Sequence, residues 1–223
     1  MAVIVAVAVN TDGRREIFGI TVMPSEAETF WSDFLRSLTR RGLRGMQMVI
    51  SDAHEGLKAA ARKVLDAGWQ RCRVHFQRNL LARANKTNKP VVSAVVKTVF
   101  AEKNRGQAHA RWREVADNLR DRLRDVAVLM DTAKHNVLAY TAFDESLRPK
   151  VHSTNPLERM NKEIKRRTNV VGKFPNREAV IRLVGALLLE QNDDRAVSRR
   201  YMSVEKLTGL CDHPDDAAMI AAQ

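Results

Sequence analysis

The first third of the chain is a succession of short apolar runs separated by turn signals. Residues 2–9 (AVIVAVAV) are apolar without alternation, which predicts a strand that is buried on both faces. The turn signal NTDG at residues 10–13 precedes a second apolar run at 15–23, so the two runs are expected to pair as a hairpin. Residues 46–51 and 69–74 predict a third and a fourth strand.

Helical periodicity lies between and after these strands. Residues 25–41 carry apolar side chains on one helical face, and Ser25 with Glu28 forms a capping box at the expected start. From residue 75 to about residue 140 the pattern is helical, which predicts an all-α stretch. The order β-β-α-β-α-β followed by helices favours an α/β fold, in which helices cover the faces of a mixed sheet. The other helices are expected near residues 53–65, 156–169, 177–191 and 203–210.

Composition narrows the class of protein. The chain has 223 residues, of which 44% are hydrophobic and 29% charged, which is typical of a globular protein and too apolar for a disordered one. No apolar run approaches the roughly 18 to 20 residues of a membrane span, and residues 2–9 lack the charged start of a signal peptide. Two cysteines exclude a disulfide framework. These features predict a reduced, cytoplasmic protein.

The charge of the chain is positive and unevenly distributed. The 38 Lys and Arg residues exceed the 26 Asp and Glu residues, which gives a formal net charge of +12. Residues 67–100 contain seven basic residues and no acidic one, and residues 152–182 contain eight basic residues against three acidic. One basic run is often only a solvated face, but two of them favour a partner that carries phosphates, such as a nucleic acid.

Asp52 is the first candidate for chemistry. It follows the third predicted strand directly, where open α/β sheets place their ligands, and its carboxylate could hold Mg²⁺. A local alternative is at least as strong, because Asp52 and Glu55 also form a capping box for the next helix. His54 could contact a substrate, although a solvent-exposed histidine is the simpler interpretation.

Glu158 is the second candidate. Asn155, Pro156 and Glu158 are residue types that begin helices, so this carboxylate also has a local role open to it. The helix it opens is strongly cationic, which favours a site for phosphates. Glu163 lies about 140° further round that helix and is expected to pair with Arg167 at i+4. The basic residues of the helix are Arg159, Lys162, Lys165, Arg166 and Arg167.

Cys72 and His75 form a C-x-x-H pair at the end of the fourth predicted strand. A zinc site would need two further ligands, and Cys211 with His213 is the only other such pair, in an unrelated context. A buried thiol and a histidine at a helix start are the expected interpretation.

Three motifs in order resemble the Mutator-type transposases of bacterial insertion sequences. They are VISDAHEGL at residues 49–57, CRVHF at 72–76 and STNPLERMNKEIKRR at 153–167. The segments VVG at 170–172 and FPN at 174–176 also match, so the resemblance reaches from the first strand to about residue 207. Three motifs with this spacing are far more specific than any one carboxylate.

The resemblance implies an RNase H-like fold with a DDE triad of two Asp and one Glu that binds two Mg²⁺ ions. Asp52 then matches the second Asp and Glu158 the Glu, and Cys72 with His75 matches a family motif of less clear role. The two metals of such a site clamp the attacking and leaving oxygens of a phosphoryl transfer. Water first attacks the DNA and cuts a strand at the end of the insertion sequence, and the freed 3′-hydroxyl then attacks target DNA.

The resemblance also implies domain boundaries and binding partners. Residues 1–75 would be the first part of the catalytic core, 76–150 an all-α insertion, 151–210 the rest of the core, and 211–223 a tail. Double-stranded DNA at the element ends and the target would be the partner, and a homo-oligomer is expected. The residues expected to bind DNA phosphates are Arg73, Arg78, Arg159, Lys162, Lys165, Arg166 and Arg167.

One part of the family pattern has no match. The first Asp lies on a strand that precedes the one at residues 2–9. In the family's own order residues 2–9 form the second strand, and the missing first strand lies between that strand and the fourth. Asp12 in the hairpin turn does not replace the first Asp. An N-terminally truncated transposase, or one whose start is misassigned, is therefore the leading interpretation. The alternatives are a non-catalytic DNA-binding or regulatory remnant, and another RNase H-like nuclease, which the long helical stretch disfavours.

Overall fold

The computed structural model describes residues 2–23, 25, 27–197 and 199–211, and these divide into two compact units. Unit 1 contains the described residues of 2–47, 54–67 and 155–211. Unit 2 contains residues 48–53 and 68–154. Among the described helices, none combines the length and the apolar composition that a membrane span requires.

Unit 1 begins with the hairpin that the sequence predicts. Strands β1 (Ala2–Val9) and β2 (Arg15–Met23) pair in antiparallel fashion, with an irregularity in register between Ala6 and Val7. Gly13 adopts a positive φ of 75° in the turn, a conformation that glycine reaches without the strain that other residues incur. The expectation that β1 is buried on both faces is wrong, because its residues are half-buried and Val3 is 39% exposed.

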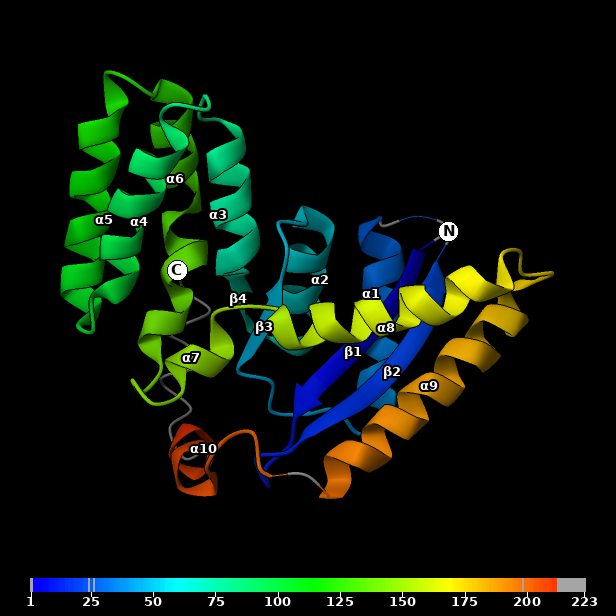
Figure 1. Ribbon diagram of the computed structural model, residues 1–223. Coiled ribbons are helices and arrows are strands. Elements are labelled where there is room, and N and C mark those ends of the chain that lie inside the picture. The colour runs from blue at the N-terminus through cyan, green and yellow to red at the C-terminus, as the bar shows by residue number, and fades with distance from the viewer. Residues whose placement is uncertain (1, 24, 26, 198, 212–223) are drawn as a thin grey trace. The chain divides into compact units, whose positions relative to one another are not determined.

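Helices cover the hairpin of unit 1 (Figure 1). Buried side chains of α8 (Asn155–Val171) and α9 (Arg177–Val197) form an apolar cluster that packs against both strands. Helix α1 (Glu28–Arg40) packs against β2, where the absence of a side chain at Gly19 leaves room for Leu38. Helix α2 (Glu55–Leu65) packs against α1, and α10 (Val204–Cys211) is the last element described.

Unit 2 joins a pair of strands to a bundle of helices (Figure 1). Strands β3 (Met48–Ser51) and β4 (Gly68–Arg71) are parallel. The helical stretch expected from residue 75 is confirmed, and Trp112, Phe76 and Leu80 are fully buried in its core. The helices are α3 (Arg73–Ala82), α4 (Lys89–Ala101), α5 (Arg105–Arg120), α6 (Arg124–Leu138), the 3₁₀ turn η1 (Ala139–Ala142) and α7 (Arg148–Val151).

The buried amide of Gln70 links β4 to the end of α6. Its Nε2 donates to the carbonyl of Val137 at 2.9 Å, and its Oε1 accepts from the backbone N–H of Tyr140 at 2.7 Å. Gln70 has no exposed surface, so these bonds satisfy an amide that would otherwise be costly to bury.

Several expected elements differ in the structure. The described strands form two separate two-stranded sheets, where the pattern predicted a single mixed sheet. Helix α1 begins at Glu28 after an Ala27 cap that makes no side-chain bond, so the capping box at Ser25 is wrong. Strand β4 ends at Arg71, earlier than expected, because Cys72 is already the N-cap of α3. Of the expected tail at 211–223, all but Cys211 lies outside the described residues.

Candidate functional site

Asp52 lies directly after the carboxyl end of β3 in unit 2, and its side chain is exposed. Its Oδ1 accepts from the N–H of Ala53 at 2.7 Å. The capping-box alternative for Asp52 is wrong, because His54 is the N-cap of α2 and its Nδ1 accepts from Leu57 N–H at 3.1 Å. The carboxylate of Asp52 is therefore not used to begin a helix and is open to a ligand.

Hydrogen bonds to Ser51 fix the backbone on which Asp52 stands. The indole of Trp69 donates to Ser51 Oγ at 2.8 Å, and Ser51 Oγ donates to the carbonyl of Asp52 at 2.8 Å. The N–H of Cys72 donates to the carbonyl of Ser51 at 2.7 Å. These contacts come from β4 and its end, so the second strand of the sheet holds the position of Asp52.

Cys72 is the centre of a junction within unit 2. Its buried sulfur accepts from the N–H and the Oγ1 of Thr154, at 3.4 and 3.2 Å. Beside it, the N–H of Arg73 donates to the carbonyl of His152 at 2.9 Å. The expectation of a buried thiol is confirmed, and the sulfur ties the end of β4 to the segment that leads toward Asn155.

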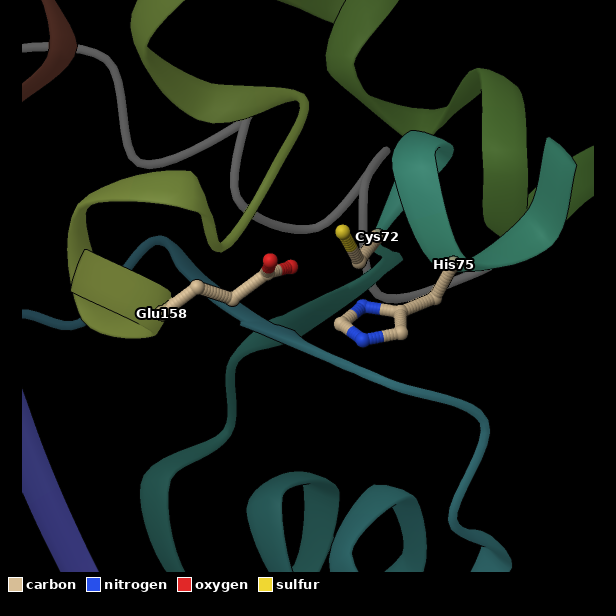
Figure 2. A group of neighbouring side chains, drawn as sticks. All are labelled: Cys72, His75 and Glu158. Carbon is tan, nitrogen blue, oxygen red and sulfur yellow. The ribbon is translucent and has the colours of Figure 1, made fainter. Parts of the chain in front are cut away.

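Figure 2 shows the side chains of Cys72, His75 and Glu158. Cys72 and His75 belong to unit 2, where Cys72 caps α3 and His75 lies half-buried on its first turn. Glu158 belongs to unit 1, where it lies half-buried in the first turn of α8. Each of the three offers an atom type that metals bind, respectively sulfur, nitrogen and oxygen.

Helix α8 presents its cations to solvent. Met160 and Ile164 bury one face of the helix in the apolar cluster of unit 1, which turns the charged side chains outward. The five cations named from the sequence are all exposed, namely Arg159, Lys162, Lys165, Arg166 and Arg167.

Glu163 forms ion pairs with two of these cations. Its carboxylate pairs with Arg166 at 2.7 Å and with Arg167 at 2.9 Å, so the expected i+4 pair is confirmed and a second partner is added. Hydrogen bonds from Arg166 and then Arg167 lower the pKa of Glu163 to about 2. Within the described residues, Arg159, Lys162 and Lys165 form no ion pair, so their charge is available to an anion.

Arg73 and Arg78 differ in their surroundings within unit 2. The guanidinium of Arg73 stacks over Phe100, with Cζ 4.7 Å from the ring centroid, and is half-buried. Burial and then the charge of Arg73 lower the pKa of His152 to about 4. Arg78 is exposed on α3. Arg73 thus has a packing role that Arg78 lacks.

Sequence reasoning missed the residues that support the candidates. Thr154 lies inside the third motif, but nothing local indicates that it bonds to a sulfur 82 positions earlier. Ser51 and Trp69 carry no signal of their own. The sequence predicts a substrate contact or a solvent-exposed side chain for His54, whereas His54 caps α2.

Comparison with known proteins identifies the family. The model of the family described as "Transposase, Mutator family" matches residues 1–198. The chain is 44% identical over 206 residues to the transposase for insertion sequence element IS1081 of Mycobacterium tuberculosis, which covers 92% of this chain and 50% of that protein. The chain therefore belongs to the Mutator family of transposases.

Two further relatives give the same result. The transposase for insertion sequence element IS406 of Burkholderia multivorans is 37% identical over 216 residues, which is 91% of this chain and 53% of the relative. The transposase for insertion sequence element IS256 in transposon Tn4001 of Staphylococcus aureus is 34% identical over 206 residues, with the same two shares. The chain spans about half the length of the curated relatives that it matches.

Proposed function

We propose that this chain carries part of the catalytic domain of a DDE transposase, which cuts and joins DNA strands with Mg²⁺. Asp52 supports the proposal most directly. It stands exposed at the carboxyl end of β3, is not needed as a helix cap, and rests on a backbone that β4 holds. Open α/β sheets place their ligands at this end of a strand. Glu158, in the first turn of cationic α8, is the second proposed catalytic carboxylate.

We further propose that the two strand pairs belong to an RNase H-like sheet. Strand order supports this, since an antiparallel hairpin is followed by a parallel pair whose strands are connected through α2. Among the described strands, β1 and β3 each pair on one side only. In the family fold, the strand that carries the first Asp lies between the strands that β1 and β3 match.

The proposed metal fits the oxygen donors of the chain. Mg²⁺ prefers carboxylate oxygens and usually takes only one or two of them from protein. Within the described residues, one oxygen of Asp52 accepts a hydrogen bond from Ala53, and the other is open. The sulfur of Cys72 already accepts two hydrogen bonds from Thr154, so it needs no metal to be satisfied. When bound, Mg²⁺ would stabilise charge on the attacking and leaving oxygens of the phosphate.

The protein's own residues would hold and orient the DNA. Asp52 and Glu158 are the proposed metal ligands, and Arg159, Lys162 and Lys165 on α8 would neutralise phosphates near the scissile bond. Arg166 and Arg167 share Glu163, so each contributes less net charge. Double-stranded DNA at the element ends and the target is the proposed substrate, acted on by a homo-oligomer.

Substitution of the two carboxylates tests the proposal. The test compares this chain, and a version extended by its in-frame upstream coding sequence, on duplexes from the two flanks of its gene with Mg²⁺ present. In whichever version cleaves, Asp52→Asn and Glu158→Gln are expected to lower the cleavage rate by about 10³-fold or more, while DNA binding is retained.

Glu163→Gln is the matched control, because Glu163 lies on the same helix and its ion pairs within the described residues are with surface arginines. It should cleave within a few-fold of the unaltered protein. Cleavage that survives Asp52→Asn would remove Asp52 from the site. Binding without cleavage in both versions would overturn the catalytic proposal.

A further inference from the structure

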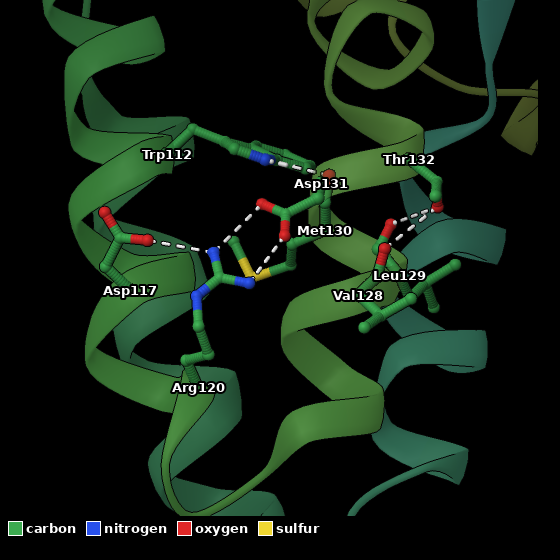
Figure 3. Close-up of polar contacts among 8 residues, drawn as sticks. All are labelled: Trp112, Asp117, Arg120, Val128, Leu129, Met130, Asp131 and Thr132. Atoms are coloured by element: carbon green, nitrogen blue, oxygen red, sulfur yellow. Dashed lines mark hydrogen bonds and ion pairs between the residues drawn. The ribbon is translucent and has the colours of Figure 1, made fainter.

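Helices α3 and α4 of unit 2 carry basic residues and no acidic one. Residues 68–101, which form β4, α3, α4 and their connections, contain seven Lys and Arg residues and lack Asp and Glu. On α5, by contrast, Arg120 lies between Asp117 and Asp131, at 2.9 Å from each (Figure 3). The surface of α3 and α4 therefore differs in charge from that of the neighbouring helix pair.

Two contacts hold α3 and α4 side by side. Near the start of α3, the guanidinium of Arg73 stacks over Phe100 at the end of α4, with Cζ 4.7 Å from the ring centroid. Further along α3, Nε2 of Gln77 donates to Oγ of Ser93 at 3.4 Å. The two helices therefore run antiparallel, and their exposed sides form one continuous surface.

Three lysines lie on one face of α4 and of the turn that leads into it. The carbonyl of Asn85 accepts from the N–H of Lys89 at 3.1 Å, so the chain is already helical when α4 begins. Lys86, Lys89 and Lys97 follow at i, i+3 and i+11, which places them within about 80° of one another around the axis. Ser93 lies in the same sector, so the lysines border the line of contact with α3.

Arg78 adds a cation from α3. It follows Gln77 and lies on the exposed side of the helix, opposite Phe76 and Leu80, which have no exposed surface. Arg78 and the three lysines are all exposed, and none of the four forms an ion pair with another described residue. We call this set the α3–α4 basic face, and its members are Arg78, Lys86, Lys89 and Lys97.

We propose that the α3–α4 basic face binds the phosphate backbone of duplex DNA, through residues other than those of helix α8. The inference rests on the proposed function for its substrate. The eleven helical steps from Lys86 to Lys97 span about 16 Å. Phosphates follow one another every 3.4 Å of axis along each strand, so this length reaches several of them. Because the lysines have no acidic partner, they give up no ion pair when they contact a phosphate.

The uncharged side chains of this surface favour backbone contacts over base stacking. Ser93 and Gln77, which lie between the cations, are of the types that donate hydrogen bonds to phosphate oxygens. Phe76 is fully buried, and Phe100 lies under the guanidinium of Arg73. Proteins that bind single strands stack the bases on aromatic rings, so the basic face suits a duplex better than a single strand.

Fluorescence anisotropy with a labelled duplex tests the basic face in the full chain. Lys89→Gln/Lys97→Gln is expected to weaken binding by about 10-fold or more near 0.1 M salt. The variant should also reduce the slope of log K against log salt by nearly two, since each phosphate contact contributes about 0.9. Both lysines are exposed, so the fold should be retained, and thermal unfolding of the variant checks this.

Lys103→Gln/Arg111→Gln is the matched control. It removes the same charge from unit 2, but Lys103 pairs with Glu145 at 2.9 Å and Arg111 with Glu114 at 2.7 Å. Because these cations are already paired, the control should change binding less than two-fold. Equal effects of the two double variants would show that only the net charge matters and would overturn the inference.

A second readout locates the contact directly. Acetylation of lysines, followed by mass spectrometry with and without duplex DNA, should show Lys86, Lys89 and Lys97 losing reactivity when DNA is bound, while Lys103 keeps its own. Unchanged reactivity of the three lysines would contradict the proposal. Polyglutamate that displaces the duplex as effectively as unlabelled duplex of equal charge would indicate a site for an acidic protein segment and would also overturn it.

The binding assay requires no cleavage, so the two proposals can fail separately. If Asp52→Asn leaves cleavage intact while Lys89→Gln/Lys97→Gln binds weakly, the catalytic proposal fails and the basic face stands. If Asp52→Asn abolishes cleavage while the lysine variant binds normally, the basic face fails alone.

Discussion

The cluster that α8 and α9 form against the hairpin of unit 1 is apolar, whereas the interior of unit 2 contains fully buried hydrogen bonds with defined directions. Met160, Ile164, Val184 and Leu188 form the cluster of unit 1. In unit 2, the amide of Gln70 bonds to the backbone at the end of α6, and the indole of Trp112 donates to the carbonyl of Met130 at 3.0 Å (Figure 3). Apolar packing has no preferred direction, whereas a buried hydrogen bond requires its donor and acceptor to be aligned.

The difference bears on the candidate chemistry. Strand β4 carries Gln70 and Trp69, and the end of β4 holds the backbone beside Asp52 through Cys72. The buried bonds of Gln70 therefore fix the register of the element on which Asp52 depends. Glu158, by contrast, stands on a helix whose buried side chains, Met160 and Ile164, make mainly apolar contacts, and such contacts tolerate small adjustments. We therefore expect the loss of a buried hydrogen-bonding side chain to destabilise unit 2 most. In unit 1 we expect the truncation of a buried apolar side chain to be the informative change.

The largest effect is expected for Gln70→Ala. The variant removes a fully buried amide, leaves the N–H of Tyr140 and the carbonyl of Val137 without their partner, and opens a cavity. We expect a loss of about 3 kcal/mol in the free energy of unfolding, measured by urea denaturation. Gln77→Ala is the control, because its amide makes only a long 3.4 Å contact with Ser93 and should cost less than about 0.5 kcal/mol. Equal losses would show that unit 2 does not depend on its buried amide.

A smaller effect is expected for Val184→Ala in unit 1. Val184 has no exposed surface and lies in the aliphatic cluster, so the lost methyl groups should cost about 2 kcal/mol. Val170→Ala is the matched control, since Val170 is 85% exposed on α8 and should be nearly neutral. Hydrogen exchange, followed by mass spectrometry, locates the loss. A loss of protection confined to unit 2 would contradict the assignment of Val184 to the core of unit 1.

Sequence patterns predicted local secondary structure and missed the hydrogen bonds that join segments far apart in the chain. The hairpin was predictable because NTDG at residues 10–13 lies between two apolar runs, and the helical stretch of unit 2 because its periodicity is long. The sulfur of Cys72 bonds to Thr154, and the amide of Gln70 to residues of α6 and η1, so no local pattern contains these contacts.

In the candidate site too, local patterns predicted some residues, and others were recognisable only from the fold. Asp52 was predictable as a residue that follows an apolar strand, but its local alternative as a helix cap could be dismissed only when His54 was seen to cap α2. The contact of Thr154 with the sulfur of Cys72 was not predictable, because the two residues are 82 positions apart in the sequence.

The smallest expected effect sharpens the contrast between the units, because their titrating groups respond to different ranges of pH. In unit 2 the pKa values of His109 and His152 are lowered to about 4, so the fold favours the neutral rings. This stability is fully present above the unfolded pKa of about 6.5 and is lost as the pH falls toward 4, by roughly 1 kcal/mol for each ring after solvent screening.

In unit 1 the lowered pKa of Glu163, about 2, gives stability that is present above about pH 4.5 and lost only as the pH falls toward 2. Hydrogen exchange between pH 7 and pH 4 should therefore show unit 2 losing protection first, while unit 1 changes little. His109→Gln/His152→Gln should remove most of the acid sensitivity of unit 2 without lowering its protection at pH 8. Among the described residues, the histidines with a lowered pKa both lie in unit 2, and Glu163 keeps its charge above about pH 4.5. If unit 1 opens first in this range, the histidines do not control the acid response.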